Sequence, residues 1–173
     1  VLSFVIVAVL FSIFIPNQYK SSTVLAPTQD SGSALTGMQS QVGGLASLAG
    51  ISLGKGKADE ATIALTVMRS WGFIESFLNE ANISHEVYAS TGWDKDSNKL
   101  IFDRSIYDPD KKEWKNKPNG WNLYQSFMDK ITIARDFESG LVTISVETFS
   151  PIHSKKWLDL YVSAINEHMR KRK

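Results

Sequence analysis

One serine of this chain stands in a pattern that is typical of hydrolases. Residues 50–54 read Gly-Ile-Ser-Leu-Gly and match the G-x-S-x-G pattern, which holds a nucleophilic serine on a sharp strand-to-helix turn. That turn needs a buried strand before Ser52, but the preceding residues are mainly Gly, Ala and Leu. We therefore interpret the segment as a loop. A membrane-tethered hydrolase with Ser52 as its nucleophile is the least favoured of the functions considered below.

Lysines beside glycines at residues 54–57 suggest a phosphate-binding loop until the spacing is counted. The pattern requires a glycine five positions before the second glycine and a hydroxyl residue after the lysine. One register has Ile51 and Ala58 at these two positions, and the other has Ala49 and Gly56. Both registers fail, so this segment is interpreted as a solvent-exposed basic turn.

Two groups of residues could bind a metal ion. Asp94, Asp96 and Asn98 match positions 1, 3 and 5 of a calcium loop, but Lys99 replaces the turn glycine and Ser105 the acidic residue at position 12. An Asp-rich turn is the better interpretation. The three histidines are widely separated and the chain has no cysteine, so no zinc-ligand spacing is present. These histidines are His85, His153 and His168. We predict no catalytic residue, no cofactor and no metal site.

Three of the five tryptophans lie in a polar segment, residues 82–122. Trp93, Trp114 and Trp121 could stack on sugar rings there, because an indole offers a flat apolar face with a polar edge. The favoured interpretation is that they pin loops to the core of the domain.

The composition predicts one globular domain. The chain has 173 residues, of which 43% are hydrophobic and 21% charged, and its net charge is +1. Because positive and negative charges nearly cancel, the chain has no strong overall electrostatic field that would attract it to nucleic acid. The lack of cysteine fits either a reducing compartment or a bacterial envelope protein without disulfides.

Residues 1–15 carry no charge and stop at Pro16, which predicts a transmembrane helix. At about 1.5 Å per residue the run covers roughly 22 Å of a hydrocarbon layer about 30 Å thick, so we expect upstream residues to be missing. A signal peptide is a less favoured alternative, because no small-x-small cleavage site follows. A buried core helix is the third alternative.

Hydrophobic periodicity predicts an α+β domain over residues 16–173, a small mixed sheet flanked by helices. Its expected elements are a strand at residues 19–25, a Gly/Ala/Ser-rich loop at 31–57, and an amphipathic helix at 59–81 that Gly72 interrupts. We expect short elements and exposed loops at 82–122, followed by a helical turn at 123–129. We then expect a hairpin formed by 131–134 and 141–149, and the start of a long helix at 151–173 with Ser150 as N-cap.

The order of these parts resembles the polysaccharide chain-length determinant family, the polysaccharide co-polymerases. The match is carried by residues 44–51, by residues 69–78 (RSWGFIESFL) and by the run from Val142 through Pro151 and Trp157 to Asn166. Ser150 replaces the usual Asp of the family, and Ser154 a usual Ala. Family members continue into a long periplasmic helix and a second membrane helix, so we expect this sequence to be a partial one.

The resemblance implies a protein of the bacterial inner membrane, single-pass in this portion, with its bulk in the periplasm. It implies a ring-like homo-oligomer that acts with the polysaccharide polymerase and sets the modal length of O-antigen lipopolysaccharide or a related polysaccharide. Membrane lipid and the growing glycan are further candidate partners, and the Gly/Ala/Leu segment and final helix are candidate subunit contacts. A non-enzymatic role is expected. Alternatives are a capsule or exopolysaccharide co-polymerase linked to a tyrosine kinase, and an envelope adaptor unrelated to glycans.

Overall fold

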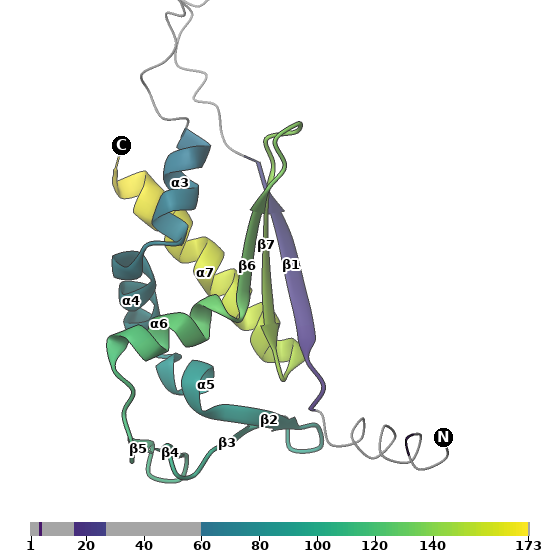
Figure 1. Cartoon of the computed structure of the whole chain (residues 1–173), viewed down its shortest axis with the longest axis vertical. Helices are drawn as coiled ribbons and strands as arrows, with labels where there is room; N and C mark the ends of the chain where they lie inside the picture. Colours follow the sequence, from purple (N-terminus) through teal and green to yellow (C-terminus); the bar gives the residue numbers. More distant parts are fainter. Residues whose placement is uncertain (1–3, 5–15, 27–59, 173) are drawn as a thin grey trace, which may run out of the picture.

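A three-stranded antiparallel sheet organises the part of the chain that the computed structural model describes, which comprises residues 4, 16–26 and 60–172 (Figure 1). The strand order is β1 (Tyr19–Leu25), β7 (Val142–Thr148) and β6 (Ile131–Arg135). Ile144 of β7 pairs with Thr23 on one side and with Ile133 on the other. Because side chains alternate along a strand, the apolar residues of β6 and β7 share one face. The predicted strand and hairpin are confirmed.

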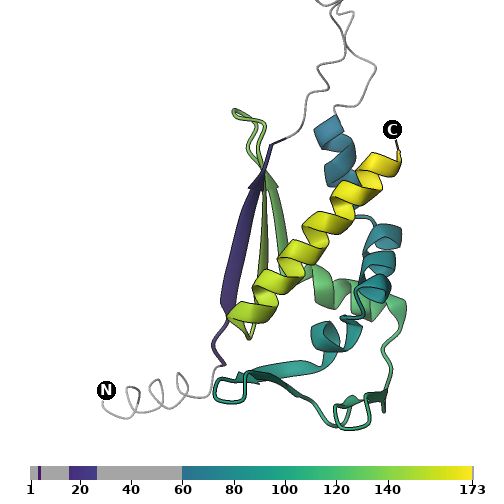
Figure 2. The ribbon, with the colours of Figure 1, turned by 180° about the vertical axis from the view of Figure 1, so that it is seen from behind.

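Helix α7 (Pro151–Lys171) covers that apolar face of the sheet, and Figure 2 shows it crossing the strands obliquely. The side chain of Ser150 accepts a hydrogen bond from the backbone N–H of His153, and Pro151 stands in the first turn, where it costs no intrahelical bond. A stripe at helical spacing is buried against the sheet and the other helices: Trp157, Leu158, Tyr161 and Ile165. The expected N-cap and helix start are confirmed.

The helix expected at residues 59–81 is two helices, α3 (Glu60–Met68) and α4 (Trp71–Glu80). The chain breaks at Ser70, whose side chain accepts from the N–H of Phe73 and so caps α4. Gly72, which was expected to interrupt the helix, lies inside the first turn of α4. The predicted position of the break is therefore wrong. The break lies where the Ser70 side chain caps a new helix, while the first turn of α4 accommodates Gly72.

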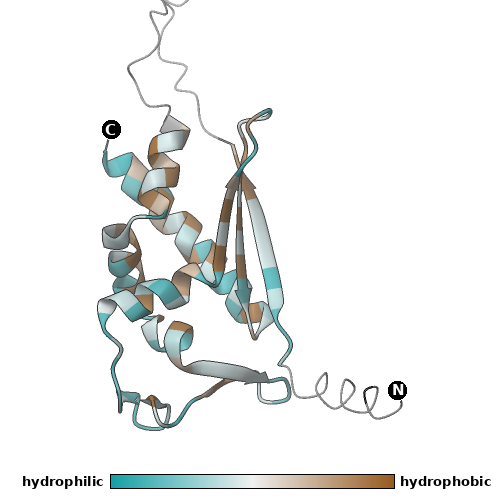
Figure 3. Ribbon diagram, viewed as in Figure 1, coloured by the Kyte–Doolittle hydropathy of each residue, from teal (hydrophilic) through white to brown (hydrophobic). Residues whose placement is uncertain are grey.

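Short elements fill the polar segment, as expected. They are α5 (Ser84–Ala89), the hairpin of β2 (Ser90–Asp94) and β3 (Lys99–Phe102), and the hairpin of β4 (Tyr107–Asp108) and β5 (Glu113–Trp114). Helix α6 (Gly120–Met128) follows, with the side chain of Asn119 accepting from the N–H of Asn122 at 2.8 Å. In Figure 3 hydrophobic colouring is concentrated on β6, β7 and the helices, while the loops of this segment are mostly hydrophilic.

The expected fold class needs two corrections. The central sheet is antiparallel throughout, not mixed, because both neighbours of β7 run against it. The expected transmembrane helix is not found: within residues 4, 16–26 and 60–172 no helix has the length and apolar character needed to cross a bilayer. The long helix α7, for example, carries Lys155, Asp159 and Glu167 along its length. Residues 1–15, on which the expectation rests, lie outside the described residues except for Phe4, as does the predicted loop at 31–57.

Candidate functional site

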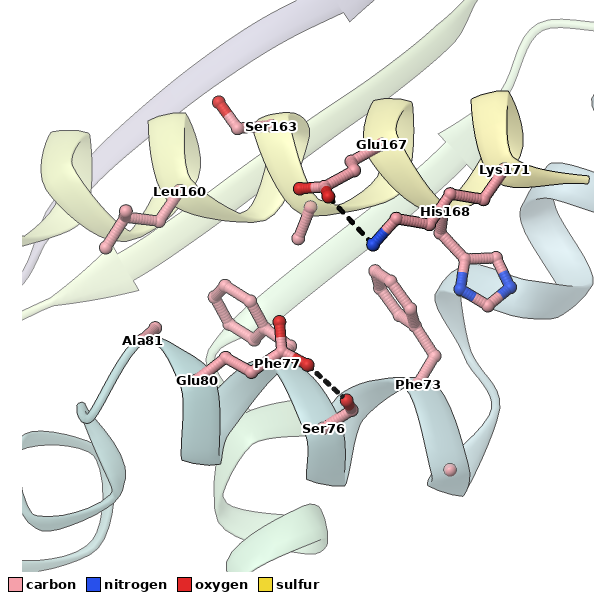
Figure 4. Close-up of a pocket in the computed structure, with 12 residues that line it drawn as sticks. Phe73, Ser76, Phe77, Glu80, Ala81, Leu160, Ser163, Glu167, His168 and Lys171 are labelled. Atoms are coloured by element: carbon pink, nitrogen blue, oxygen red, sulfur yellow. Dashed lines mark hydrogen bonds and ion pairs between the residues drawn. The ribbon is translucent and has the colours of Figure 1, made fainter.

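A groove of about 420 Å³ runs between α4 and α7 (Figure 4). The two helices meet there although they lie far apart in the sequence. Near the groove α7 is also bonded to α3, because the Tyr161 hydroxyl donates to the backbone carbonyl of Met68 at 2.5 Å. Burial raises the pKa of the Tyr161 hydroxyl, so this hydroxyl keeps its proton and remains a donor. Buried contacts beneath the groove therefore hold α7 in place.

Aromatic rings form the floor of the groove. Phe77 and Phe73 contact the buried ring of Tyr161 edge to face, with centroids 5.2 and 5.7 Å apart. His168 meets Phe73 in the same way at 5.4 Å. Ala164 on α7 has too small a side chain to fill the space above these rings. The groove therefore has a floor of aromatic rings, and it stays open because Ala164 beside them is small.

Polar side chains form the rim, and Figure 4 shows them on both helices. On α4 the Ser76 hydroxyl donates to Glu80 at 2.7 Å, and on α7 the Lys171 ammonium donates to Glu167 at 2.8 Å. The bond from Lys171 holds the pKa of Glu167 below its ordinary value, and the same bond raises the pKa of Lys171. Both charges are therefore present at neutral pH, so the rim is suited to binding a polar surface over an aromatic floor.

An exposed aromatic cluster lies at the start of α4, on the side of this helix that faces α6. Trp71, Trp121 and Tyr124 stack on one another with centroids 5.3 to 5.5 Å apart and planes within 26° of parallel. Trp71 is 37% exposed and Trp121 is 53% exposed. The Tyr124 hydroxyl donates to the carbonyl of Arg69 at 2.9 Å, which ties α6 to the start of α4. Exposed aromatic groups of this kind mark interaction surfaces.

The remaining tryptophans of the polar segment are packed. The Trp93 indole donates to Asn98 at 3.0 Å across its hairpin and meets the Tyr19 ring edge to face. Trp114 meets Tyr107 edge to face at 5.5 Å. Trp93 and Trp114 therefore pin loops, as predicted. Trp121 differs, because it is exposed and stacks on Trp71 of α4.

The candidate calcium residues form a turn. Asp94 accepts hydrogen bonds from the Ser97 hydroxyl and from the backbone N–H of Asp96, and these bonds lower the pKa of its carboxyl group. The carboxylate is thereby committed to its own turn at the tip of the β2–β3 hairpin. In residues 4, 16–26 and 60–172 no group of three or more His, Asp and Glu side chains is placed to hold a metal ion. The candidates Ser52 and residues 54–57 lie outside the described residues.

The structure brings a half-buried acidic residue into contact with α7 that sequence reasoning missed. Glu86 of α5 has only 13% of its side chain exposed, and it accepts from the Trp157 indole at 2.7 Å and from Lys156 at 3.0 Å. His85 and His153 lie near this pair, and burial lowers the pKa of both imidazoles. A single glutamate on a short helix gives no sequence signal, because its partners are 70 and 71 residues away.

Comparison of the chain with known proteins leaves its family open. No model of a protein family matches the sequence, and no curated protein matches it either. The resemblance to chain-length determinants accordingly stays a prediction, carried by the residues named above, and the function is a matter for proposal.

Proposed function

We propose that this chain regulates the chain length of O-antigen lipopolysaccharide or a related surface polysaccharide. It does so by assembling with copies of itself at the bacterial inner membrane and acting together with the polysaccharide polymerase. Glycosyl transfer is the work of the polymerase, while the assembled chain holds or measures the growing glycan.

One observation carries this proposal: the groove joins the two described segments on which the resemblance rests. Phe73 and Ser76 come from residues 69–78, and Ser163 and Ala164 come from the run between Val142 and Asn166. Segments that are modest as separate motifs therefore form one surface with an aromatic floor and a charged rim. Such a surface works by binding, in keeping with a protein that organises a polymerase.

A second copy of this chain is the occupant that the surface favours. The rim offers both charge signs, with Glu80 and Glu167 beside Lys171, and the whole chain is nearly balanced at a net charge of +1. Two copies consequently do not repel each other strongly, and opposite charges can pair across the contact.

The function is tested by deleting the gene in its bacterial host, restoring it in trans, and comparing lipopolysaccharide ladders on a gel. The proposal predicts that deletion scatters a modal band and that the restored gene returns it. A ladder unchanged by deletion, followed by an unchanged length distribution of the capsule or other surface polysaccharide, would contradict the proposal.

The contact is tested separately, and the absence of cysteine makes that test clean. Ser163→Cys places one thiol at the exposed edge of the groove, and Asn166→Cys places one on α7 outside it. With a photoreactive reagent on the thiol, Cys at position 163 should cross-link to a second copy much more often than Cys at position 166. Equal yields from the two variants would remove the groove as a contact.

A further inference from the structure

A second pocket, of about 350 Å³, lies in the hairpin region, residues 82–116, which comprises α5 and the β2–β3 and β4–β5 hairpins. Its walls are three aromatic residues, Phe102, Tyr107 and Trp114, together with Pro109, and three polar residues complete the lining: Asn82, His85 and Lys112. Pockets of this size, with apolar walls and a few polar groups, are typical of small-ligand sites.

The rings of the pocket hold one another in place. Tyr107 is at the centre, stacked on His85 with centroids 4.8 Å apart, tilted against Phe102 at 5.4 Å and edge to face with Trp114 at 5.5 Å. Tyr107 is buried, while Phe102 and Trp114 keep part of their surface accessible. The walls are therefore rigid, so little side-chain entropy is lost when a ligand binds.

The polar groups of the pocket can bind hydroxyl groups and one negative charge. Burial lowers the pKa of the His85 imidazole, so at neutral pH it is uncharged and carries one donor and one acceptor nitrogen. The amide of Asn82 offers both functions as well. Within the described residues Lys112 forms no ion pair, whereas its neighbours Arg104 and Lys115 pair with Asp110 and Asp108. Its ammonium is therefore free to meet an anion.

The backbone at the pocket is held in an uncommon conformation. Among the described residues three other than glycine have positive φ, and two of them, Asn82 at 53° and Lys112 at 56°, line this pocket. Asparagine tolerates that region, but a lysine with its Cβ does so at a cost. Asn or Gly at position 112 would form this turn with less backbone strain. The property that lysine adds there is its ammonium group.

We propose that this pocket binds one pyranose unit that bears a carboxylate, as a uronic acid does. The C–H face of the sugar ring packs on Phe102 and Trp114, the two rings of the pocket that keep accessible surface, its hydroxyls bond Asn82 and His85, and its carboxylate pairs with Lys112. The choice of a sugar as ligand rests on the proposed function, since it makes an acidic unit of the glycan the natural occupant. The choice of an acidic sugar rests on Lys112.

The proposal is tested by titrating the whole chain with methyl β-glucuronide and, in parallel, with methyl β-glucoside, which lacks the carboxylate. The readout is the five indole N–H signals in a nitrogen-correlated NMR spectrum. The signal of Trp114, assigned with Trp114→Phe, should shift and saturate with the glucuronide, while that of Trp121 should not. The glucoside should bind about tenfold more weakly, because it lacks one charge-assisted hydrogen bond.

Lys112→Asn separates binding from folding. It should weaken glucuronide binding about tenfold and at the same time raise the midpoint of thermal unfolding, since Asn accepts the left-handed backbone. The matched control Lys111→Asn changes an exposed neighbour outside the pocket and should alter neither quantity. A lower unfolding midpoint in Lys112→Asn with unchanged binding would show a structural lysine and overturn the proposal.

The outcomes for this pocket and for the proposed function can be told apart. No saturable shift of Trp114, or equal affinity for the two glycosides, overturns the acidic-sugar site whatever the ladder shows. A ladder that depends on the gene while the glucuronide fails to bind leaves chain-length regulation standing and removes only this site.

Discussion

The sheet with α7 and the hairpin region are held together by different forces. In the first, apolar side chains such as Ile144, Val146 and Trp157 are buried at regular spacing between a strand and a helix. In the second, β4 and β5 pair over two residues each, and the chain is held by ring contacts around Tyr107 and by carboxylates that bond their own turns. One region is specified by hydrophobic pattern, and the other by local polar contacts.

This difference separates stability from binding. Burial of apolar surface contributes most of the free energy of folding, so changes in the sheet and α7 should act on the whole domain. The hairpin region contributes less burial, and it keeps polar groups accessible at a pocket. Loops on a stable scaffold are a common place for binding residues for the same reason.

Trp157→Ala should have the largest effect. The side chain is 1% exposed and its indole donates to Glu86, so truncation leaves a cavity and an acceptor without its donor. We expect a loss of about 3–5 kcal/mol in the free energy of unfolding, measured by urea denaturation. The matched control Trp121→Ala, on an exposed ring, should cost under about 1 kcal/mol. Equal losses would contradict the claim that burial against α7 contributes most of the stability of the domain.

Tyr161→Phe should have the next largest effect on the same measurement. It keeps the ring that Phe73 and Phe77 contact but removes the hydroxyl that bonds the Met68 carbonyl. A buried carbonyl without its donor costs about 1–3 kcal/mol. In the hairpin region Tyr88→Phe is the control, because the Tyr88 hydroxyl forms no hydrogen bond with any of residues 4, 16–26 and 60–172, and it should be close to neutral.

Mild acid should destabilise the domain through two half-buried histidines. Burial lowers the pKa of His85 and His153, so below the ordinary value of 6.5 the unfolded chain binds protons that the folded chain does not. The free energy of unfolding should therefore fall as pH drops through about 6.5. The carboxylates with lowered pKa, such as Asp94, titrate below the ordinary value of 3.8 and act only at lower pH. His85→Gln should flatten the slope between pH 7 and 5, and an unchanged slope would contradict this cause.

Hydrogen exchange should show the smallest but most local contrast. Amides of β7, paired on both edges, should open only with the whole domain, while those of β4 and β5 should exchange through local opening at lower free energy. Equal protection of the two regions would mean that the hairpins belong to the same cooperative unit.

The elements that sequence reasoning located are those with local signals. Alternation in Val142–Thr148 and the Ser150–Pro151 cap depend on neighbours in the chain, and both were predicted. The break at Ser70 was missed because a capping serine and a nearby glycine compete, and the hydrogen bond decides between them. The groove was missed for another reason: it arises from contacts such as that between Tyr161 and Met68, 93 residues apart, which no local pattern encodes.

The most direct test of the account is the lipopolysaccharide ladder of a deletion strain restored with one of two variants. Ser163→Trp places an indole over the groove without disturbing a buried residue, and Asn166→Trp places the same group on an exposed position of α7 outside the groove. With both proteins present at equal levels, the account predicts that Asn166→Trp restores the modal band and that Ser163→Trp does not. Restoration by both variants would contradict the role of the groove, and a ladder indifferent to the gene would contradict chain-length regulation itself.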